Sequence, residues 1–274
     1  MNSMELACRY ESDGLLDSVD VLAPERAGYY AERYMQFIET YLDHPDYPKW
    51  TYGKAELLLG WVVELAAEKA LLNVIAALLG PNILLWNAFL PAKAPKTSGL
   101  FGWHQDATYW PVAPTSRIVS AWVAVCTVNS RNGGMRMVRG SHQAGPVPHE
   151  KTFDPKSMLR RGQRAQVDAD SPNIVHIDLA AGQASFHHPL TLHCSGPNES
   201  DEWRLGIGLN YAASDVSPLS GHSDSAMLLR GSAGNTRFVL EEPPDGDMSA
   251  SALALFNEAA LRQKARYSDA RATD

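Results

Sequence analysis

His104 and Asp106 place an imidazole and a carboxylate two positions apart, within the segment Trp103-His104-Gln105-Asp106. If this segment is a strand, both side chains point to the same face and Gln105 points away. A histidine from a distant strand would complete a 2-His-1-carboxylate triad, which binds iron(II) on three positions and leaves three open. The His-x-Asp pair alone is a weak signal, because such pairs arise often by chance.

The third ligand has three candidates close together in the chain, His187, His188 and His193. His193 is favoured by its neighbourhood, because Arg204 follows it by eleven positions. An arginine guanidinium binds a carboxylate through a two-pronged fork, so it can hold a small dicarboxylate near a metal.

Arg204 begins a segment, residues 204–211, whose alternation predicts a strand. One face of this strand would be apolar, and the other would carry Arg204 beside Gly206 and Gly208. We expect the glycines to leave empty volume next to the guanidinium, as a pocket for a dicarboxylate requires. A surface salt bridge for Arg204 and a bulge at the glycines are the structural alternatives.

The elements that must position these residues change in character at Asn82. Before it, apolar residues at helical spacing predict helices over residues 22–42 and 54–79, the second ended by Gly80-Pro81. After it, short β-branched segments bounded by turn residues predict a sheet-based core backed by helices. The expected strands are residues 83–90, 118–128, 135–138, 173–179, 183–187 and 204–211.

Composition narrows the class of protein. The chain has 274 residues, a formal net charge of −7 and three cysteines. We expect no nucleic-acid partner, because the nearest approach to a basic run is Arg160-Arg161 with Arg164. We expect no membrane span, because no apolar run approaches about 20 residues. We expect no signal peptide, because residues 1–5 lack its basic-then-apolar order. The few, separated cysteines favour a reducing cytoplasm, which also suits ferrous iron.

These motifs resemble those of the phytanoyl-CoA dioxygenase (PhyH) family of iron(II)- and 2-oxoglutarate-dependent oxygenases. Residues 103–110 resemble the family's proximal metal motif, residues 132–142 its glycine-rich turn and strand, and residues 193–200 with Arg204 its distal motif. Near the start, residues 10–14 look like its opening strand. The resemblance covers nearly the whole chain, and the joint match of proximal and distal motifs in this order is highly specific.

The resemblance implies a mainly β fold with flanking helices (α+β), a double-stranded β-helix or cupin-like jelly-roll. It implies a single domain over residues 1–274. Its parts would be a helical N-terminal part at about 20–80, a jelly-roll core at about 82–240 and a C-terminal helix, which apolar residues at helical spacing predict at about 249–267. That last helix would pack on the sheet or on a second subunit, so a homodimer is one expectation.

The resemblance also assigns roles to residues. It implies that His104, Asp106 and His193 bind iron(II), that Arg204 pairs with the far carboxylate of 2-oxoglutarate, and that Ser195 hydrogen-bonds that carboxylate. Further cosubstrate contacts are expected at Trp122, Trp86 and Lys93. Candidate substrate contacts are Thr108, Tyr109 and Trp110, which core packing would equally explain. Arg136 and Arg139 are further candidates, for which an exposed salt bridge is the favoured alternative.

The implied reaction uses dioxygen and 2-oxoglutarate to hydroxylate an unactivated C–H bond of a small-molecule metabolite, releasing succinate and carbon dioxide. Desaturation, cyclisation, epimerisation and halogenation are alternative outcomes at the same iron. Intact Asp106 disfavours halogenation, since the halogenating branch of the family has Ala or Gly there. A 2-oxoglutarate-independent cupin-type enzyme and a non-catalytic binding protein are further alternatives, against which Arg204 and Ser195 argue. Arg139 departs from the family's usual Pro before Gly-Ser-His, which we expect to alter a turn or a substrate contact.

Overall fold

The computed structural model describes residues 2–152, 154–159, 163–219, 221 and 223–269, with only the backbone for Tyr109 and residues 263–269. Arg160 and Arg161, the nearest approach to a basic run, lie outside the described residues. The chain divides into two compact units. The first unit contains Met1–Ala31, Pro91–Trp110 and Ser120–Ile207, and the second contains Glu32–Leu90, Pro111–Val119 and Gly208–Asp274. The single domain over residues 1–274 stays a prediction.

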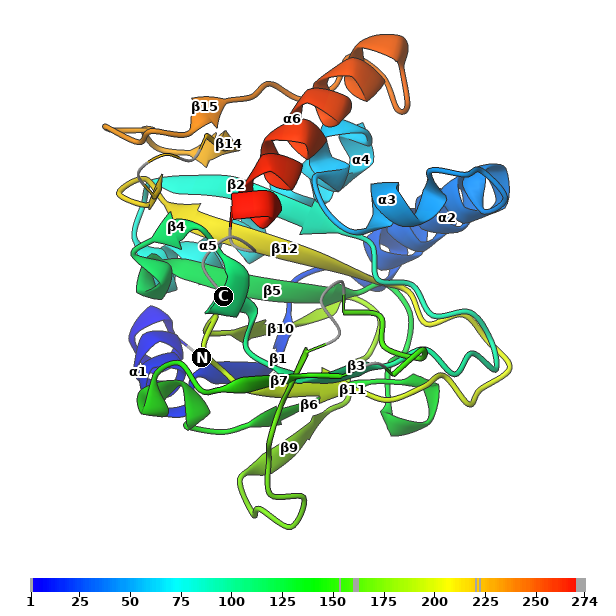
Figure 1. The fold of residues 1–274 in the computed structure, drawn as a ribbon, viewed down its shortest axis with the longest axis vertical. Coiled ribbons are helices and arrows are strands. Elements are labelled where there is room, and N and C mark those ends of the chain that lie inside the picture. The colour runs from blue at the N-terminus through cyan, green and yellow to red at the C-terminus, as the bar shows by residue number, and fades with distance from the viewer. Residues whose placement is uncertain (1, 153, 160–162, 220, 222, 270–274) are drawn as a thin grey trace. The chain divides into compact units, whose positions relative to one another are not determined.

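Two groups of antiparallel strands form the first unit (Figure 1). The first group is β1 (Leu15–Asp20), β10 (Gln183–His187) and β5 (Ile118–Ala124), in that order. The second is a four-stranded sheet in the order β3 (Phe101–His104), β11 (His193–Ser195), β6 (Met135–Val138) and β9 (Ile174–Ile177). A hairpin of β7 (His149–Lys151) and β8 (Gln163–Ala165) accompanies them, with short 3-10 turns at Ser130–Asn132 and Ser141–Ala144.

Apolar side chains from both groups of strands share one core. Leu15 of β1, Trp122 of β5, Met137 of β6 and Ile177 of β9 belong to a single cluster of buried residues. Because strand side chains alternate between faces, the intervening Arg136 of β6 is exposed. Two antiparallel layers packed over an apolar core are the arrangement of a jelly-roll.

The first unit begins with a helix where the sequence predicts a strand. Residues 10–14 are not an opening strand, because α1 (Ser3–Asp13) continues to Gly14. Gly14 ends the helix in the left-handed conformation, with φ of 72°, and its N–H donates to the carbonyl of Tyr10 at 2.8 Å. The strand β1 starts immediately afterwards, at Leu15.

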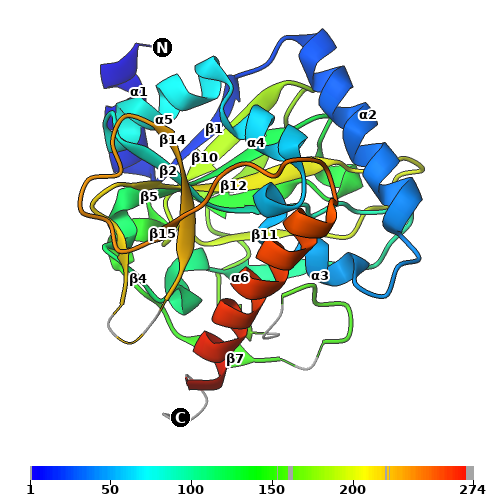
Figure 2. The same cartoon turned by 90° about the horizontal axis from the view of Figure 1, so that it is seen from above.

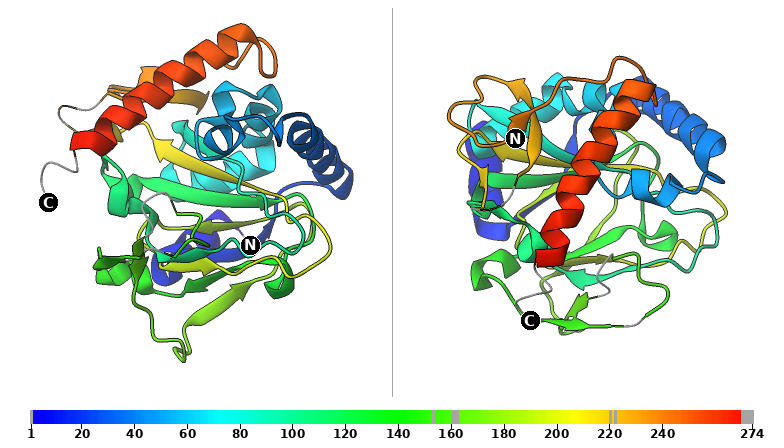
Figure 3. Two further views of the ribbon diagram at one scale, coloured as in Figure 1. Left: turned by 45° about the vertical axis from the view of Figure 1, so that its right-hand side comes forward. Right: turned by 45° about the horizontal axis from the view of Figure 1, so that its top comes forward.

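The second unit combines strands with helices. Its strands lie in the order β12 (Gly206–Ala213), β2 (Ile83–Phe89), β14 (Ser225–Arg230) and β15 (Val239–Leu240), and a short pair joins β4 (Val112–Ala113) to β13 (Ser217–Pro218). The helix α2 (Pro24–Tyr41) runs from the residues of the first unit into those of the second. The other helices, which Figures 2 and 3 show from further directions, are α3 (Tyr47–Thr51), α4 (Gly60–Ala66), α5 (Lys69–Leu79) and α6 (Ala250–Asp269), with 3-10 turns at Ala55–Leu57 and Thr115–Arg117.

The single helix expected over residues 54–79 is wrong. Lys54 has a left-handed backbone, with φ of 60°, and Glu68 is extended between α4 and α5. The buried Lys54 ammonium donates to the carbonyls of Trp86 and Ser225, each at 2.7 Å, which binds this residue to the sheet of its unit. The apolar spacing persists across both breaks, so periodicity alone does not reveal them.

The strand predictions are confirmed with small changes of boundary. The strands β6 and β10 have the expected bounds, and β2 ends one residue early. The strands β5 and β9 are shorter than expected, and β12 starts at Gly206 rather than Arg204. The helix α6 buries Ala252, Phe256 and Ala259 on one face, as the helical spacing at about 249–267 predicts. None of the helices in the described part of the chain is long and apolar enough to cross a bilayer.

Candidate metal centre

The two metal-binding motifs meet on adjacent strands of the first unit. His104 is the last residue of β3, His193 is the first residue of β11, and the two face each other directly in the antiparallel register. Asp106 is not on the strand, because the chain turns into a 3-10 helix (Asp106–Tyr109) at this residue. The shared strand face expected for His104 and Asp106 is therefore wrong, although the turn still brings the carboxylate beside both imidazoles.

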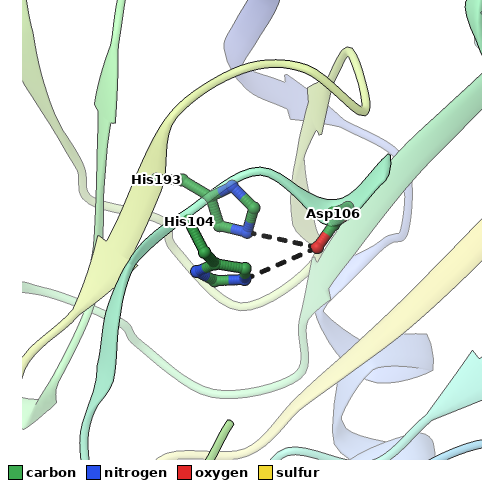
Figure 4. Close-up of side chains that lie close together, drawn as sticks. All are labelled: His104, Asp106 and His193. Atoms are coloured by element: carbon green, nitrogen blue, oxygen red, sulfur yellow. Dashed lines mark ion pairs between the residues drawn. The ribbon is translucent and has the colours of Figure 1, made fainter. Parts of the chain in front are cut away.

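The three candidate ligands form one compact cluster (Figure 4). Nε2 of His104 lies 3.5 Å from Oδ1 of Asp106, and Nε2 of His193 lies 3.6 Å from the same oxygen. The rings of His104 and His193 are 4.1 Å apart between centroids. Three potential ligand atoms, two nitrogens and one oxygen, thus converge on one point.

Backbone carbonyls set the orientation of both imidazoles. Nδ1 of His104 lies 2.8 Å from the carbonyl oxygen of Gly102, and Nδ1 of His193 lies 3.0 Å from that of Thr191. A carbonyl can only accept, so each Nδ1 carries the proton and each Nε2 keeps a lone pair. This arrangement is the usual outer support of a metal-binding histidine.

The charges of the cluster suit a divalent metal. Burial, with the neighbouring His104 adding to it, lowers the pKa of His193 to about 3, which keeps this imidazole neutral. Burial raises the pKa of Asp106, but the three surrounding imidazoles, His193 first and then His104 and His187, outweigh it and hold the pKa well below its usual value. Two neutral imidazoles and one carboxylate are the donor set of non-haem iron(II), so the residues present fit this metal.

Gln105 fastens the proximal motif to the loop that precedes His193. Its buried amide nitrogen donates to the carbonyls of Gly145 at 2.9 Å and Leu190 at 2.8 Å, and its oxygen accepts from the N–H of Val147 at 2.9 Å. The sequence correctly predicts that Gln105 points away from the ligands. Its anchoring role has no signal in the motif itself.

The two competing histidines have other partners. Nε2 of His187 lies 3.3 Å from Oδ2 of Asp106, the oxygen that does not face the other imidazoles. The ring of His188 lies against those of Tyr10 and His142. The geometry therefore selects His193 as the third ligand and places His187 beside the site, a contact that sequence reasoning missed.

A buried cationic group lies on the same unit. Lys93 and Arg204 are 1% and 2% exposed, and their backbones form a reciprocal pair of hydrogen bonds, each of 3.0 Å. The Lys93 ammonium donates to the hydroxyl of Ser195 at 2.7 Å and to the carbonyl of Gly196. Burial, followed by the positive charge of Arg204, lowers the pKa of Lys93 to about 6. The structure thus brings Lys93 and Arg204 together with Ser195. Ser195 lies on β11, two residues after His193.

The volume beside the glycines is filled, which corrects the expectation of an empty space there. A Cβ on Gly206 would lie 1.9 Å from a ring carbon of Trp122, and one on Gly208 would lie 2.1 Å from the ring of Phe89. The guanidinium carbon of Arg204 lies 5.1 Å from the centroid of Trp122. Gly206 therefore makes room for the indole that stacks on Arg204.

The remaining cosubstrate candidate belongs to the second unit. Trp86 on β2 donates its indole N–H to Oδ2 of Asp224 at 2.6 Å, and both side chains are buried. A cosubstrate contact at Trp86 stays a prediction.

Substrate candidates lie in different settings. Thr108 is exposed and Trp110 is half-buried, while the side chain of Tyr109 lies outside the described residues. Arg136 stacks over Trp103 at 5.4 Å and faces Cys194 across β6 and β11, so it is on the opposite side of the strand from His193. Arg139 forms an ion pair with Asp13 of α1. A substrate contact stays a prediction for all five.

Comparisons with known proteins agree with this geometry. The family model described as "Phytanoyl-CoA dioxygenase (PhyH)" matches residues 10–206. The peroxisomal phytanoyl-CoA dioxygenase of Rattus norvegicus is 32% identical over 146 residues, which are 52% of this chain and only 43% of the rat protein. This chain therefore matches less than half the length of that relative.

Solved structures match over almost the whole chain. The non-heme monooxygenase ThoJ, without ligand, has a TM-score of 0.85 and 30% identity, covering 98% of this chain and 100% of ThoJ. Its nickel complex has a TM-score of 0.80 and 29% identity over 96% of this chain and 99% of ThoJ. The expected mainly β fold with flanking helices, of the 2-oxoglutarate oxygenase type, is confirmed. With the matched family model and the assembled His104–Asp106–His193 triad, the chain belongs to the phytanoyl-CoA dioxygenase (PhyH) family of iron(II)- and 2-oxoglutarate-dependent oxygenases.

Proposed function

We propose that this chain is a hydroxylase that inserts oxygen into an unactivated C–H bond of a small-molecule metabolite, with release of succinate and carbon dioxide. The observation that carries the proposal is the triad of two buried histidines and the half-buried Asp106, in which both imidazoles turn Nε2 toward one carboxylate oxygen. A triad of this kind binds iron(II) and leaves three positions open. Iron with 2-oxoglutarate and dioxygen supplies the oxidising chemistry, while the protein binds and orients the reactants.

We assign the far carboxylate of 2-oxoglutarate to the buried cationic group. Burial and the charge of Arg204 disfavour the charged form of Lys93, and a bound anion beside both groups would favour it again. Arg204 can offer a fork to the carboxylate, and stacking on Trp122 keeps the guanidinium plane in place. Ser195 holds its hydroxyl beside the Lys93 ammonium, where it can donate to the same carboxylate.

Hydroxylation is preferred to other oxidative outcomes for two reasons. The solved structure that covers 98% of this chain at 30% identity is named a monooxygenase, which favours oxygen insertion here. Asp106 is intact, so no ligand position is left vacant for a halide. Thr108 and Trp110, directly after the Asp106 ligand, are our candidates for residues that select the substrate.

The cellular setting that we propose is a reducing cytoplasm. The three cysteines, Cys8, Cys126 and Cys194, are free thiols, so none is committed to a disulfide. A reducing setting also keeps iron ferrous.

The test is the conversion of 2-oxoglutarate to succinate, measured with iron(II) and dioxygen over a panel of small organic metabolites. Wild-type protein should release succinate in an iron-dependent manner, and a true substrate should raise the rate and gain one oxygen atom. Asp106→Ala should lose both signals. An Asp106→Ala variant with wild-type turnover would refute the metal assignment.

A further inference from the structure

The two oxygens of Asp106 have different partners. Oδ1 faces Nε2 of His104 and Nε2 of His193, at 3.5 and 3.6 Å. Oδ2 accepts a hydrogen bond from the Ser120 hydroxyl at 2.9 Å and lies 3.3 Å from Nε2 of His187. The carboxylate is therefore divided into a face toward the metal ligands and a face toward two hydrogen-bond donors.

Both donors are built into one pair of strands. His187 ends β10 and lies directly opposite Ser120 of β5 in the antiparallel register. Residues paired in this way project from the same face of the sheet, so the imidazole and the hydroxyl reach Oδ2 side by side. The side chain of His187 is 5% exposed, and that of Asp106 is 19% exposed. Two buried donors thus lie behind the carboxylate.

The contact also determines the tautomer of His187. A carboxylate only accepts, so the proton of this imidazole is on Nε2. Nδ1 of His187 then carries a lone pair, yet it is buried and has no hydrogen-bond partner among the described residues. A buried acceptor without a hydrogen-bond partner costs free energy, and an apolar side chain at this position would not carry that cost. The ring lies beside that of His193, with centroids 4.6 Å apart, and its polar contact is with Asp106.

We propose that His187 is a positioning residue which, together with Ser120, holds Oδ2 so that Asp106 offers only Oδ1 to the metal. Monodentate binding by Asp106 keeps three positions of a six-coordinate ion open, as the cosubstrates require. His187 itself does not bind the metal, because its Nε2 proton is directed at Oδ2. This inference rests on the proposed metal site and adds a residue that supports it.

The test measures metal binding rather than turnover. Cobalt(II) is titrated into apo-protein at fixed pH, and its dissociation constant and visible spectrum are recorded for the wild type, His187→Leu and His187→Gln. Loss of an outer-shell partner typically weakens metal binding by about 10- to 100-fold, which we expect for His187→Leu. His187→Gln keeps an N–H donor near the same place and should recover most of the affinity and the wild-type spectrum.

Two further variants keep the test decisive. Ser120→Ala removes the other donor and should also weaken cobalt(II) binding, even if His187→Leu fails to fold. His188→Asn is the matched control, because His188 is the neighbouring imidazole and its ring contacts His142 and the Leu190 N–H rather than Asp106. Its amide oxygen can replace Nδ1 as the acceptor for the Leu190 N–H, so its cobalt(II) affinity should equal that of the wild type.

The outcomes separate this inference from the proposed function. Wild-type cobalt(II) affinity in both His187→Leu and Ser120→Ala would overturn the positioning role and leave the metal site standing. Equal loss in His187→Leu and His187→Gln, with a changed spectrum in both, would show that His187 is itself a ligand and would overturn the inference. A wild-type protein that does not bind cobalt(II) would refute the metal site of the proposed function.

Discussion

Lys93 should give cosubstrate binding a distinct pH dependence. Burial, and then the charge of Arg204, lowers the pKa of Lys93 to about 6, so its amine is mostly neutral at pH 7.5 in the cosubstrate-free protein. A carboxylate of 2-oxoglutarate beside the amine would favour the charged form and raise this pKa. Binding of 2-oxoglutarate should therefore take up a proton at any pH above about 6 and below the raised pKa.

The size of the effect follows from linkage. Where one proton is taken up for each cosubstrate bound, the dissociation constant rises by about tenfold for each unit of pH. The affinity of the wild-type protein for 2-oxoglutarate should therefore fall by up to about 100-fold between pH 6.5 and pH 8.5. Lys93→Met keeps most of the buried stem but has no titrating group, so its affinity should be lower at pH 6.5 and nearly independent of pH.

The assay is calorimetric titration of nickel(II)-loaded protein with 2-oxoglutarate, since nickel prevents turnover. Titrations in two buffers with different ionisation enthalpies count the protons taken up at each pH. Lys96→Met is the matched control, because Lys96 is 58% exposed in its side chain and pairs with Asp201. Proton uptake near zero in the wild type at pH 7.5, or the same uptake in Lys93→Met, would refute the reasoning.

Three further predictions concern packing and buried polar groups. Gly206→Ala would place a Cβ 1.9 Å from the Trp122 ring. Chemical denaturation should therefore show a free energy of unfolding lower by about 1–3 kcal/mol, and kinetic assays should show a higher KM for 2-oxoglutarate. An unchanged stability would contradict the packing argument. Gln105→Leu would deprive three backbone groups of their hydrogen-bond partner. It should lower the free energy of unfolding, measured in urea, by about 2 kcal/mol or more. An unchanged urea midpoint would show that Gln105 does not anchor the loop. Burial raises the pKa of Glu56 to about 7, with Lys54 opposing the shift and Glu241 adding to it. Between pH 4.5 and 7 the folded protein therefore keeps a proton on Glu56 that the unfolded chain releases, so stability falls as pH rises through this window. Urea titrations at pH 5 and 8 should show a smaller fall in Glu56→Gln, and an identical fall would refute the assignment.

The parts of the fold that follow from local patterns were predictable. Short segments bounded by turn residues located β6 and β10 to the residue, because Gly134 and Gly182 mark the points at which these strands begin. His104, Asp106, His193 and Arg204 were identifiable because residue type and order carry the chemistry of a metal triad and an anion partner. Their meeting in the structure depends on the pairing of β3 with β11, which no local pattern describes.

The errors arose where tertiary contacts override local preference. The break at Lys54 depends on carbonyls of Trp86 and Ser225 that are distant in sequence. The filled volume at Gly206 depends on Trp122, which lies on another strand. The support of Asp106 by Ser120 and His187 depends on the register of β5 with β10, so a reading of the metal motifs alone misses it.

The central claim is that this chain binds iron(II) and 2-oxoglutarate together at His104, Asp106 and His193, with Arg204 holding the far carboxylate. The most direct measurement is the visible absorbance that appears when 2-oxoglutarate is added to iron(II)-loaded protein without oxygen. We predict a charge-transfer band in the wild type, no band in His193→Ala, and a band in Arg204→Ala that needs a much higher concentration of 2-oxoglutarate. The absence of the band in the wild type, or an unchanged band in His193→Ala, would contradict the account.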